Sequence, residues 1–384
     1  MSQAITWVRL GSIAEFVRGI TFKPADVVPG DAPDTVRCMR TKNVQEQIDL
    51  SDVWHVGTRF VKRNEQFLKL GDLLVSSANS WNLVGKCCWV PEEAAGSTFG
   101  GFISVLRAKP DAVDQRYLYH WFSSTRTQSI VRSYGRQTTN ISNLDFARCL
   151  AMEAPLPPLM EQRRIARLLD HVNALRAKRR EAIALLGDLV QCVFLDMFGD
   201  AQRNPYGFPV QPFGNVARVK SGSFLPRTAM NTEGPYPVYG GNGIAGRHDN
   251  YLFELPKICI GRVGYYCGAV HLTEPKSWIT DNALYVSEFV DDLSIDYLYR
   301  VLRHADLNQY ASRSSQPLIS RARLNDVPIL IPPRERQEEH AKRVAGIEQL
   351  RGQHVLHLAG LDALFASIQH RAFRGELWAD APAA

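Results

Sequence analysis

Residues 157–162 read Pro-Pro-Leu-Met-Glu-Gln, and residues 332–337 read Pro-Pro-Arg-Glu-Arg-Gln, 175 positions later. Each segment opens a long stretch with helical periodicity, and proline is tolerated in the first turn of a helix. The register holds beyond the opening, because matched positions carry the same residue: Ala166 and Ala341, Leu175 and Leu350, Arg176 and Arg351, Ala184 and Ala359, Leu186 and Leu361, Phe198 and Phe373. The chain therefore contains an internal repeat.

The sequence before each helical stretch is repeated more loosely. Leu10-Gly11-Ser12-Ile13-Ala14 with Gly19 resembles Phe213-Gly214-Asn215-Val216-Ala217 with Gly222, and Tyr117-Leu118-Tyr119 recurs as Tyr297-Leu298-Tyr299. The offset changes inside these segments and not inside the helices, so insertions and deletions fall in loops. We therefore expect module one at 1–155, a central helical region at 156–203, module two at 204–330, a distal helical region at 331–377 and a tail at 378–384.

Both modules are predicted to have a mixed α/β (α+β) fold. Short runs of β-prone residues predict strands at 72–76, 86–90 and 103–106 in module one, and at 257–260, 269–272 and 283–286 in module two. Asp114 and Ser294 are plausible N-caps, so a helix is expected to follow each of them. These helices carry the Tyr-Leu-Tyr segments, whose tyrosines are expected in the core.

The two long helices are predicted to pair as an antiparallel coiled coil with pseudo-two-fold symmetry. Module two has to leave the first helix at its end and re-enter at the start of the second, which favours the antiparallel arrangement; two separate helices, each packed on its own module, are the alternative. His340 and Arg343 stand where the first helix has Ile165 and Leu168, so we expect that end to fray or to be covered by a partner. Apolar residues at three- and four-residue spacing form the predicted seam: Ile165, Leu168, Val172, Leu175, Leu186, Leu189, Val193, Ile347, Leu350, Leu361, Leu364 and Ile368.

The composition narrows the class of protein. A chain of 384 residues is long enough for two domains. It has no run of 18 apolar residues and no signal-peptide pattern, so we expect a cytoplasmic protein that does not span a membrane. Seven cysteines without a Cys-x-x-Cys motif, and scattered histidines, argue against disulfides and a metal site. A formal net charge of +6 is compatible with a polyanionic partner.

Motifs for catalysis are weak, and no catalytic residue is predicted. Residues 241–246 match Gly-x-Gly-x-x-Gly, yet no helix that could bind a phosphate is expected after them. The segment is either a plain turn or a loop whose backbone approaches DNA. Asn204-Pro205-Tyr206-Gly207 does not fit the motif of adenine methyltransferases, and residues 274–276 lack the upstream Pro-Asp pair of a metal-dependent nuclease.

Three segments resemble the specificity subunit of Type I restriction-modification systems. They read Leu-Pro-Pro-Leu-Met-Glu-Gln at 156–162, Phe-Leu-Asp-Met-Phe-Gly-Asp at 194–200 and Ala-Phe-Arg-Gly-Glu-Leu at 372–377. The resemblance covers the whole chain and implies two target-recognition domains that alternate with two helical regions, in a subunit that is not itself an enzyme.

The resemblance also implies partners, namely double-stranded DNA, two methylation subunits and a restriction subunit. S-adenosylmethionine, ATP and Mg are expected on those partner subunits and no cofactor on this chain. A protein-interaction scaffold, with two modules joined by the coiled coil, is the alternative.

DNA contacts are expected from polar and basic loop residues, because base edges require donors and acceptors and phosphates require positive charge. Little sequence is shared outside the framework, which predicts two different half-sites and an asymmetric target. Residues 161–198 as a helix would span about 57 Å, or about 17 base pairs, and would set the gap between half-sites. The candidates are Arg40, Lys42, Asn43, Asn79, Ser80, Arg136, Gln137, Thr138 and Asn140 in module one, and Lys220, Ser221, Tyr239, Asn242, Arg262, Asp281, Asn282, Arg313, Ser315 and Gln316 in module two.

Overall fold

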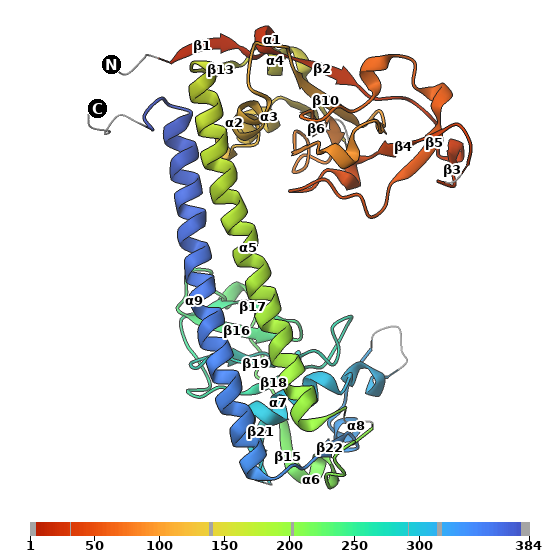
Figure 1. The fold of residues 1–384 in the computed structure, drawn as a ribbon. Coiled ribbons are helices and arrows are strands. Elements are labelled where there is room, and N and C mark those ends of the chain that lie inside the picture. Colours follow the sequence, from red (N-terminus) through yellow and green to blue (C-terminus); the bar gives the residue numbers. More distant parts are fainter. Residues whose placement is uncertain are drawn as a thin grey trace. The chain divides into compact units, whose positions relative to one another are not determined.

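The computed structural model describes residues 5–30, 32–137, 141–200, 203–290, 292–312 and 317–377 (Figure 1). The chain divides into unit 1, which comprises Met1–Arg179 and His357–Ala384, and unit 2, which comprises Arg180–Leu356. The division cuts the two long helices, α5 (Leu159–Phe198) and α9 (Arg334–Ala372). Each unit therefore holds one module together with half of each helix.

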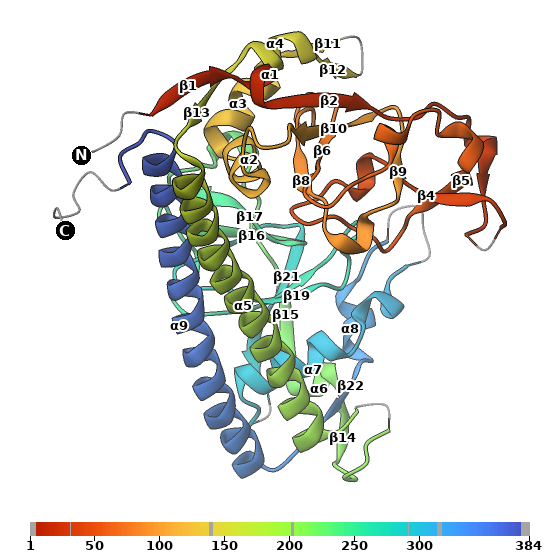
Figure 2. The same cartoon turned by 45° about the horizontal axis from the view of Figure 1, so that its top comes forward.

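Module one is built on a four-stranded antiparallel sheet with the order β2-β10-β6-β8 (Figure 2). These strands are Ala14–Arg18, Ile103–Ala108, Leu73–Ser76 and Cys87–Trp89. A smaller sheet has the order β3-β5-β4-β9, formed by Val27–Val28, Trp54–Gly57, Thr35–Met39 and Thr98–Phe99. The other elements are β1 (Thr6–Arg9) paired with β13 (Glu153–Leu156), β7 (Ala78–Asn79), β11 (Gly135–Gln137), β12 (Ser142–Leu144), α1 (Leu10–Ile13), α2 (Gln115–Phe122), α3 (Thr125–Ser133) and α4 (Phe146–Ala151).

The main sheet of module one is buried on both faces. Side chains alternate between the faces of a strand, so Leu73 and Val75 join a core with α2, α3 and the helix halves of unit 1. Leu74, between them, joins a second core with Met39 and Phe99 of the smaller sheet. The result is a layer of helices, a central sheet and a smaller sheet.

Module two repeats this arrangement. Its main sheet has the order β15-β21-β18-β19, formed by Ala217–Ser221, Ala283–Phe289, Ile258–Gly261 and Val270–Leu272. A smaller sheet has the order β17-β16-β20, formed by Gly243–His248, Tyr236–Gly240 and Trp278–Ile279. The other elements are β14 (Val210–Pro212) paired with β22 (Pro328–Leu330), α6 (Phe213–Val216), α7 (Ile295–His304) and α8 (Arg321–Asn325).

The predicted strands and N-caps are confirmed. Each of the six predicted strands overlaps a strand of a main sheet, and the Asp114 and Ser294 side chains accept a hydrogen bond from the N–H groups of Tyr117 and Tyr297. Both tyrosines are buried, and their hydroxyls donate to Pro155 O and Leu330 O at 2.9 Å.

The glutamine that ends each repeated motif fixes the start of a long helix to its module. Gln162 accepts a hydrogen bond from the N–H of Asp114 and donates one to Pro157 O, both at 2.8 Å. Gln337 accepts from the N–H of Ser294 at 2.9 Å and donates to Pro332 O at 3.1 Å. Both glutamines are 2% exposed. The repeated motif is therefore a structural joint between the helix and the cap of α2 or α7.

The long helices are antiparallel, as predicted. In unit 1 the second half of α9 lies beside the first half of α5, and in unit 2 the first half of α9 lies beside the second half of α5 (Figure 1). Arg176 of α5 pairs with Asp362 of α9 at 2.5 Å in unit 1. In unit 2 the ring of Phe194 lies 5.7 Å from the ring of His340.

The predicted seam is wrong in part. Ile165, Val172 and Ile368 are buried, and Leu168, Leu186, Val193, Ile347 and Leu361 are half-buried. By contrast, Leu175, Leu189, Leu350 and Leu364 are between 39% and 47% exposed. Each helix half packs on its module as well as on the other helix, and this shifts the buried stripe to positions such as Leu169, Val190 and Val344.

The beginning of α9 is covered by the chain itself. His340 is fully buried, with the rings of Phe194 and Phe198 of α5 at 5.7 and 5.1 Å. At His340 this end is thus covered by α5, whereas Arg343 is exposed, so coverage of this end by a partner stays a prediction. The sequence pattern gave no sign that α5 supplies these two rings.

Each unit has a polar cluster where a module helix meets a long helix. The aspartate of the cluster lies on the long helix in unit 1 and on the module helix in unit 2. In unit 1, Arg116 and His120 of α2 bind Asp170 of α5 at 2.7 and 2.8 Å. In unit 2 the carboxylate comes from the module instead: Asp296 of α7 binds Arg300 at 3.1 Å and lies 3.5 Å from His340 of α9. Burial would raise the pKa of both aspartates, but the hydrogen bonds from these neighbours outweigh it and lower the pKa.

Candidate DNA interface

Loops that carry the candidate residues meet at one end of each main sheet. In module one, β2 and β6 end there and β10 and β8 begin there, as their antiparallel register requires. β4 leads to the same end, because Gly100 donates its N–H to Met39 O at 2.9 Å. In module two, β15 and β18 end, and β21 and β19 begin, at the equivalent end.

The backbone at this end is the same in both modules. The bond from Gly100 to Met39 has its counterpart in module two, where Thr280 donates to Tyr239 O at 2.9 Å. The chain also crosses very close to itself at Gly19 and Gly222, where a Cβ atom would lie 2.3 and 2.2 Å from a carbonyl oxygen. Only glycine fits such a crossing, which explains why both repeats carry it.

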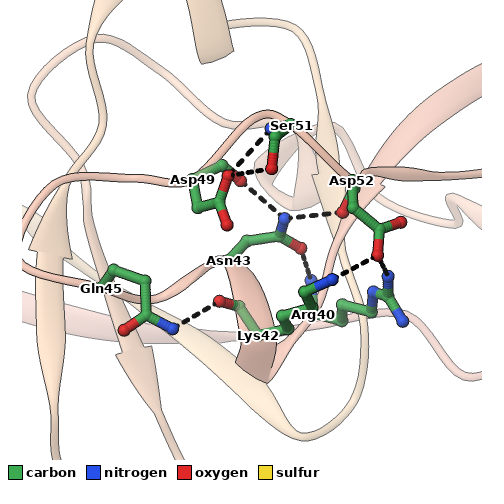
Figure 3. Close-up of polar contacts among 7 residues, drawn as sticks. All are labelled: Arg40, Lys42, Asn43, Gln45, Asp49, Ser51 and Asp52. Carbon is green, nitrogen blue, oxygen red and sulfur yellow. Dashed lines mark hydrogen bonds and ion pairs between the residues drawn. The ribbon is translucent and has the colours of Figure 1, made fainter. Parts of the chain in front are cut away.

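Arg40, Lys42 and Asn43 follow β4 and surround Asp52 (Figure 3). Arg40 and Lys42 reach the Asp52 carboxylate at 2.5 and 2.6 Å, and the Arg40 guanidinium lies 4.4 Å from the centre of the Trp54 ring. The hydrogen bond from Lys42 lowers the pKa of Asp52, so this carboxylate stays charged and offsets part of the local positive charge.

Asn43 is placed differently from its neighbours. It is fully buried and donates to Asp49 O and Asp52 O at 2.7 and 3.0 Å (Figure 3). A direct DNA contact by Asn43 does not fit this structure, because its amide is used to hold the loop. Polar residue type alone could not distinguish this buried role from an exposed one.

The other module-one candidates share a three-stranded sheet with the order β11-β12-β7. Gln137 pairs with Ser142, which pairs with Asn79. Arg136 is exposed and forms an ion pair with Asp145 at 2.5 Å. Ser80 is exposed directly after β7. The structure thus brings Asn79, Ser80, Arg136 and Gln137 together, whereas Thr138 and Asn140 lie outside the described residues.

In module two most described candidates gather at the equivalent end. Lys220 and Asn242 are exposed at the end of β15 and in the β16–β17 turn. Arg262 lies directly after β18. Its side-chain Nη1 atom is 3.4 Å from Ser221 Oγ, and its backbone N–H donates to Asn282 O. Asp281 and Asn282 are exposed directly before β21. Arg313, Ser315 and Gln316 lie outside the described residues.

Tyr239 is a correction to the predicted interface. It is 5% exposed in the core between the two sheets, and its hydroxyl accepts a hydrogen bond from the N–H of Glu274 at 3.1 Å. Burial raises its pKa. Tyr239 therefore supports the loop that begins at Gly240 and has little surface to offer DNA.

The glycine-rich segment at 241–246 forms the β16–β17 turn and the first part of β17. A strand and not a helix follows the turn, in agreement with the expectation from sequence. Asn242 lies at this turn, and the backbone of Gly241 approaches Asn282 and Gly261. Within the described ranges, no cluster of three or more potential metal ligands occurs, and no helix is long and apolar enough to cross a membrane.

Selecting polar residues missed the aromatic side chains at this end of each module. Trp81 is 42% exposed in the loop after β6, and Tyr265 is 88% exposed in the loop after β18. A sequence signal was present, since residues 264–268 read Gly-Tyr-Tyr-Cys-Gly and place two aromatics between glycines.

Known proteins resemble this chain in sequence and in fold. The family model described as "Type I restriction modification DNA specificity domain" matches residues 6–185 and 207–350. The Type I restriction enzyme EcoprrI specificity subunit of Escherichia coli is 35% identical over 102 residues, which are 27% of this chain and 25% of that subunit. The EcoKI specificity subunit of Escherichia coli K12 is 22% identical over 417 aligned positions, which cover 96% of this chain and 88% of that subunit.

Solved structures share the fold. The S subunit of the Type-I restriction-modification system from M. genitalium is 17% identical, covers 97% of each chain and superposes with a TM-score of 0.59. A chain from a study of complex assembly and conformational transition of the type I R-M system is 19% identical, with 98% of this chain and 99% of that chain covered and a TM-score of 0.51.

Proposed function

Because the chain belongs to the family of Type I restriction modification DNA specificity domains, we propose that it reads a bipartite DNA target, with one half-site for each module. It is a DNA-recognition component and not an enzyme. The two long helices set the spacer between the half-sites. Adenine methylation and cleavage are carried out by partner subunits, which hold S-adenosylmethionine, ATP and Mg.

This proposal depends on one observation: in each module, candidate residues gather at the equivalent end of the main sheet. Donors and acceptors gather there, among them the half-buried Asn79 and the exposed Ser80, Asn242 and Asn282. Such groups suit base edges in the major groove, and the neighbouring cations Lys42 and Lys220 suit phosphates. These loops differ in sequence between the modules over a shared backbone frame, so the half-sites differ and the target is asymmetric.

Two equivalent cavities support docking of two copies of one methylation subunit. A cavity of about 430 Å³ in unit 1 is lined by Ala366, Gln369, His370, Phe373 and Arg374 of α9 and its end. A cavity of about 340 Å³ in unit 2 is lined by Gln191, Phe194, Leu195, Phe198 and Gly199 of α5 and its end. Each residue of the second set lies 175 positions before its counterpart in the first set, so the two cavities occupy matched places in the repeat, with Phe198 and Phe373 in common.

Exposed leucines on the long helices extend this docking surface. Leu185 and Leu189 of α5 and Leu356 of α9 are 59%, 45% and 73% exposed in unit 2. Apolar side chains on a helix surface are typical of sites that a partner covers. We assign this surface to the methylation subunits; the restriction subunit has no assigned surface.

The test is a genome-wide map of methylated adenines. Cells that carry this chain and its neighbouring methyltransferase are compared with cells that lack only this chain. We expect one split, asymmetric motif to disappear on deletion, which gives both half-sites and the gap. An unchanged map with an active methyltransferase would contradict the proposal and favour the protein-interaction scaffold.

Docking is tested by filling one cavity at a time. Ala366→Trp and Gln191→Trp each place a large side chain in one cavity, and we expect each variant to bind one methylation subunit where the unaltered chain binds two. Native mass spectrometry of the co-expressed complex measures this ratio. Ala174→Trp, at an exposed position of α5 outside both cavity linings, is the matched control.

A further inference from the structure

The loop between the last two strands of each main sheet is built in the same way in both modules. Residues 77–86, which include the short strand β7, join β6 to β8, and residues 262–269 join β18 to β19. Gly85 donates its N–H to Ser76 O, and Gly268 donates to Gly261 O, both at 2.8 Å. Both glycines have a left-handed backbone conformation, with φ of +83° and +91°. A repeated closing bond defines two equivalent loops.

The tips of these two loops carry exposed aromatic side chains. Trp81 is 42% exposed in module one. In module two, Tyr265 and Tyr266 are 88% and 52% exposed, and their ring centroids are 5.1 Å apart in an edge-to-face arrangement. Tyr265 is the most exposed aromatic side chain in the described part of the chain.

Backbone hydrogen bonds hold these tips in place. In module two, Gly264 donates to Pro317 O at 3.1 Å, Cys267 to Gly264 O at 3.0 Å and Ala269 to Tyr266 O at 3.0 Å. In module one, Leu83 and Val84 both donate to Ser80 O, at 2.9 and 3.0 Å. The aromatic rings are therefore presented by fixed turns, which limits the conformational entropy lost when they bind.

Each aromatic lies beside candidate base-reading residues on the same loop. Ser80 precedes Trp81, and Arg262 begins the loop that carries Tyr265. The N–H of Arg262 is bonded to Asn282 O of the neighbouring loop. An aromatic ring has no charge to offer a phosphate, but it can stack on a base or enter between two base pairs.

We propose that Tyr265 in module two, and Trp81 at the equivalent place in module one, contact the bases of their half-sites through their ring faces. This inference rests on the proposed function and names a residue for each half-site. The ligand is the base stack of duplex DNA, unstacked locally at a pyrimidine–purine step, where unstacking is easiest. The aromatic contact adds to the polar contacts of the same loops.

The test uses the full complex with its methylation subunits and a labelled duplex that contains the mapped target. We expect Tyr265→Ala to weaken specific binding by about fivefold to a hundredfold, which is the range for losing one base stacked on an aromatic side chain. Tyr265→Phe keeps the ring and should retain wild-type affinity. The slope of affinity against salt should not change, since no phosphate contact is lost.

A fluorescent base reports the contact directly. With 2-aminopurine placed at successive positions of the second half-site, we expect one position to change its fluorescence on binding of the wild type and not of Tyr265→Ala. Trp81→Ala should act in the same way on the first half-site only. Phe289→Ala is the matched control, because Phe289 is an exposed aromatic at the opposite end of β21 from Ala283.

Three outcomes overturn the inference. Wild-type affinity and fluorescence in Tyr265→Ala would remove the base contact while leaving the proposed function intact. Loss of a methylation subunit from Tyr265→Ala, seen by native mass spectrometry, would assign the loop to a protein partner. A wild-type complex that prefers no sequence would overturn the proposed function, and the base contact with it.

Discussion

Module one and module two share hydrogen bonds at matched positions but differ in the side chains that those bonds support. Gln162 and Gln337 make the same two bonds, and Gly85 and Gly268 close the same loop. The tips of that loop nevertheless carry Trp81 in one module and Tyr265 in the other. The comparison teaches that the repeat preserves a backbone frame and leaves the presented surface free to differ.

The largest loss of stability is expected at a glycine whose surroundings leave no room for a Cβ atom. Gly268→Ala should cost about 3–5 kcal/mol, since alanine resists a positive φ and its Cβ would lie 2.6 Å from the backbone N of Asn308. Gly85→Ala should cost less, about 2–3 kcal/mol, because its nearest obstacle is one side-chain atom, Cγ1 of the buried Val131, and not the backbone. Urea unfolding measures both. Gly187→Ala, in an open helical position, should be neutral or stabilising, and equal costs at 85 and 268 would break the distinction.

Substitution of Gln162 and of Gln337 tests whether the repeated motif contributes equally to the stability of both units. Gln162→Ala and Gln337→Ala each leave two backbone groups, one buried and one half-buried, without their hydrogen-bond partner, so each should lower the free energy of unfolding by about 2–4 kcal/mol. Gln353→Ala, at an exposed position of α9, is the control and should change little. A small effect at one joint only would show that this unit does not depend on the motif.

Exchanging the residues at one matched position of the two long helices should change the stability by different amounts in the two directions. Ile165→His buries an imidazole in an apolar site and should cost about 2–3 kcal/mol. His340→Ile should change stability by less than about 1 kcal/mol, because His340 is surrounded by aromatic rings and Asp296 keeps its bond to Arg300. Thermal unfolding of the two variants beside the unaltered chain decides this. A large loss in His340→Ile would show that the imidazole has an essential partner.

The smallest effect concerns pH. Burial lowers the pKa of His120 below the ordinary value of 6.5, although its bond to Asp170 opposes the shift. The folded protein therefore favours the neutral ring, the unfolded chain binds more protons, and stability should fall as the pH drops below 6.5. His120→Gln should reduce this fall, measured as the unfolding midpoint from pH 7 to 5. His171→Gln, which alters an exposed histidine of the same unit, is the control.

Local signals predicted the elements of this fold well. The strands of the main sheets and the caps at Asp114 and Ser294 depend on residues close in sequence, and both were confirmed. The seam was predicted less well, because Leu175 and Leu350 have the right spacing but the modules decide which helix face is buried. Such packing depends on contacts between residues far apart in the chain.

The candidate interface was likewise predicted well where local sequence decides and less well where packing decides. Sequence reasoning selected residues from loops that the fold then brings to one sheet end, because turn residues and polar side chains mark loops. It wrongly included Asn43 and Tyr239, whose polar groups serve buried hydrogen bonds. It omitted Trp81 and Tyr265, because their exposure is fixed by loop closure at Gly85 and Gly268. DNA contact by the remaining candidates stays a prediction.

The exchanged charges of the two polar clusters bear on how a duplicated chain avoids folding onto the wrong copy of itself. If α2 docked on the start of α9, Arg116 would meet His340 and no carboxylate; if α7 docked on α5, Asp296 would meet Asp170. In the first mistaken pairing Arg116 would lose its carboxylate, and in the second Asp170 and Asp296 would share the cation Arg300, whereas each native cluster has one aspartate beside its cations. Domain swapping is a characteristic failure of repeat proteins. We therefore expect the divergence of these few residues to favour docking of each module helix on its own long helix.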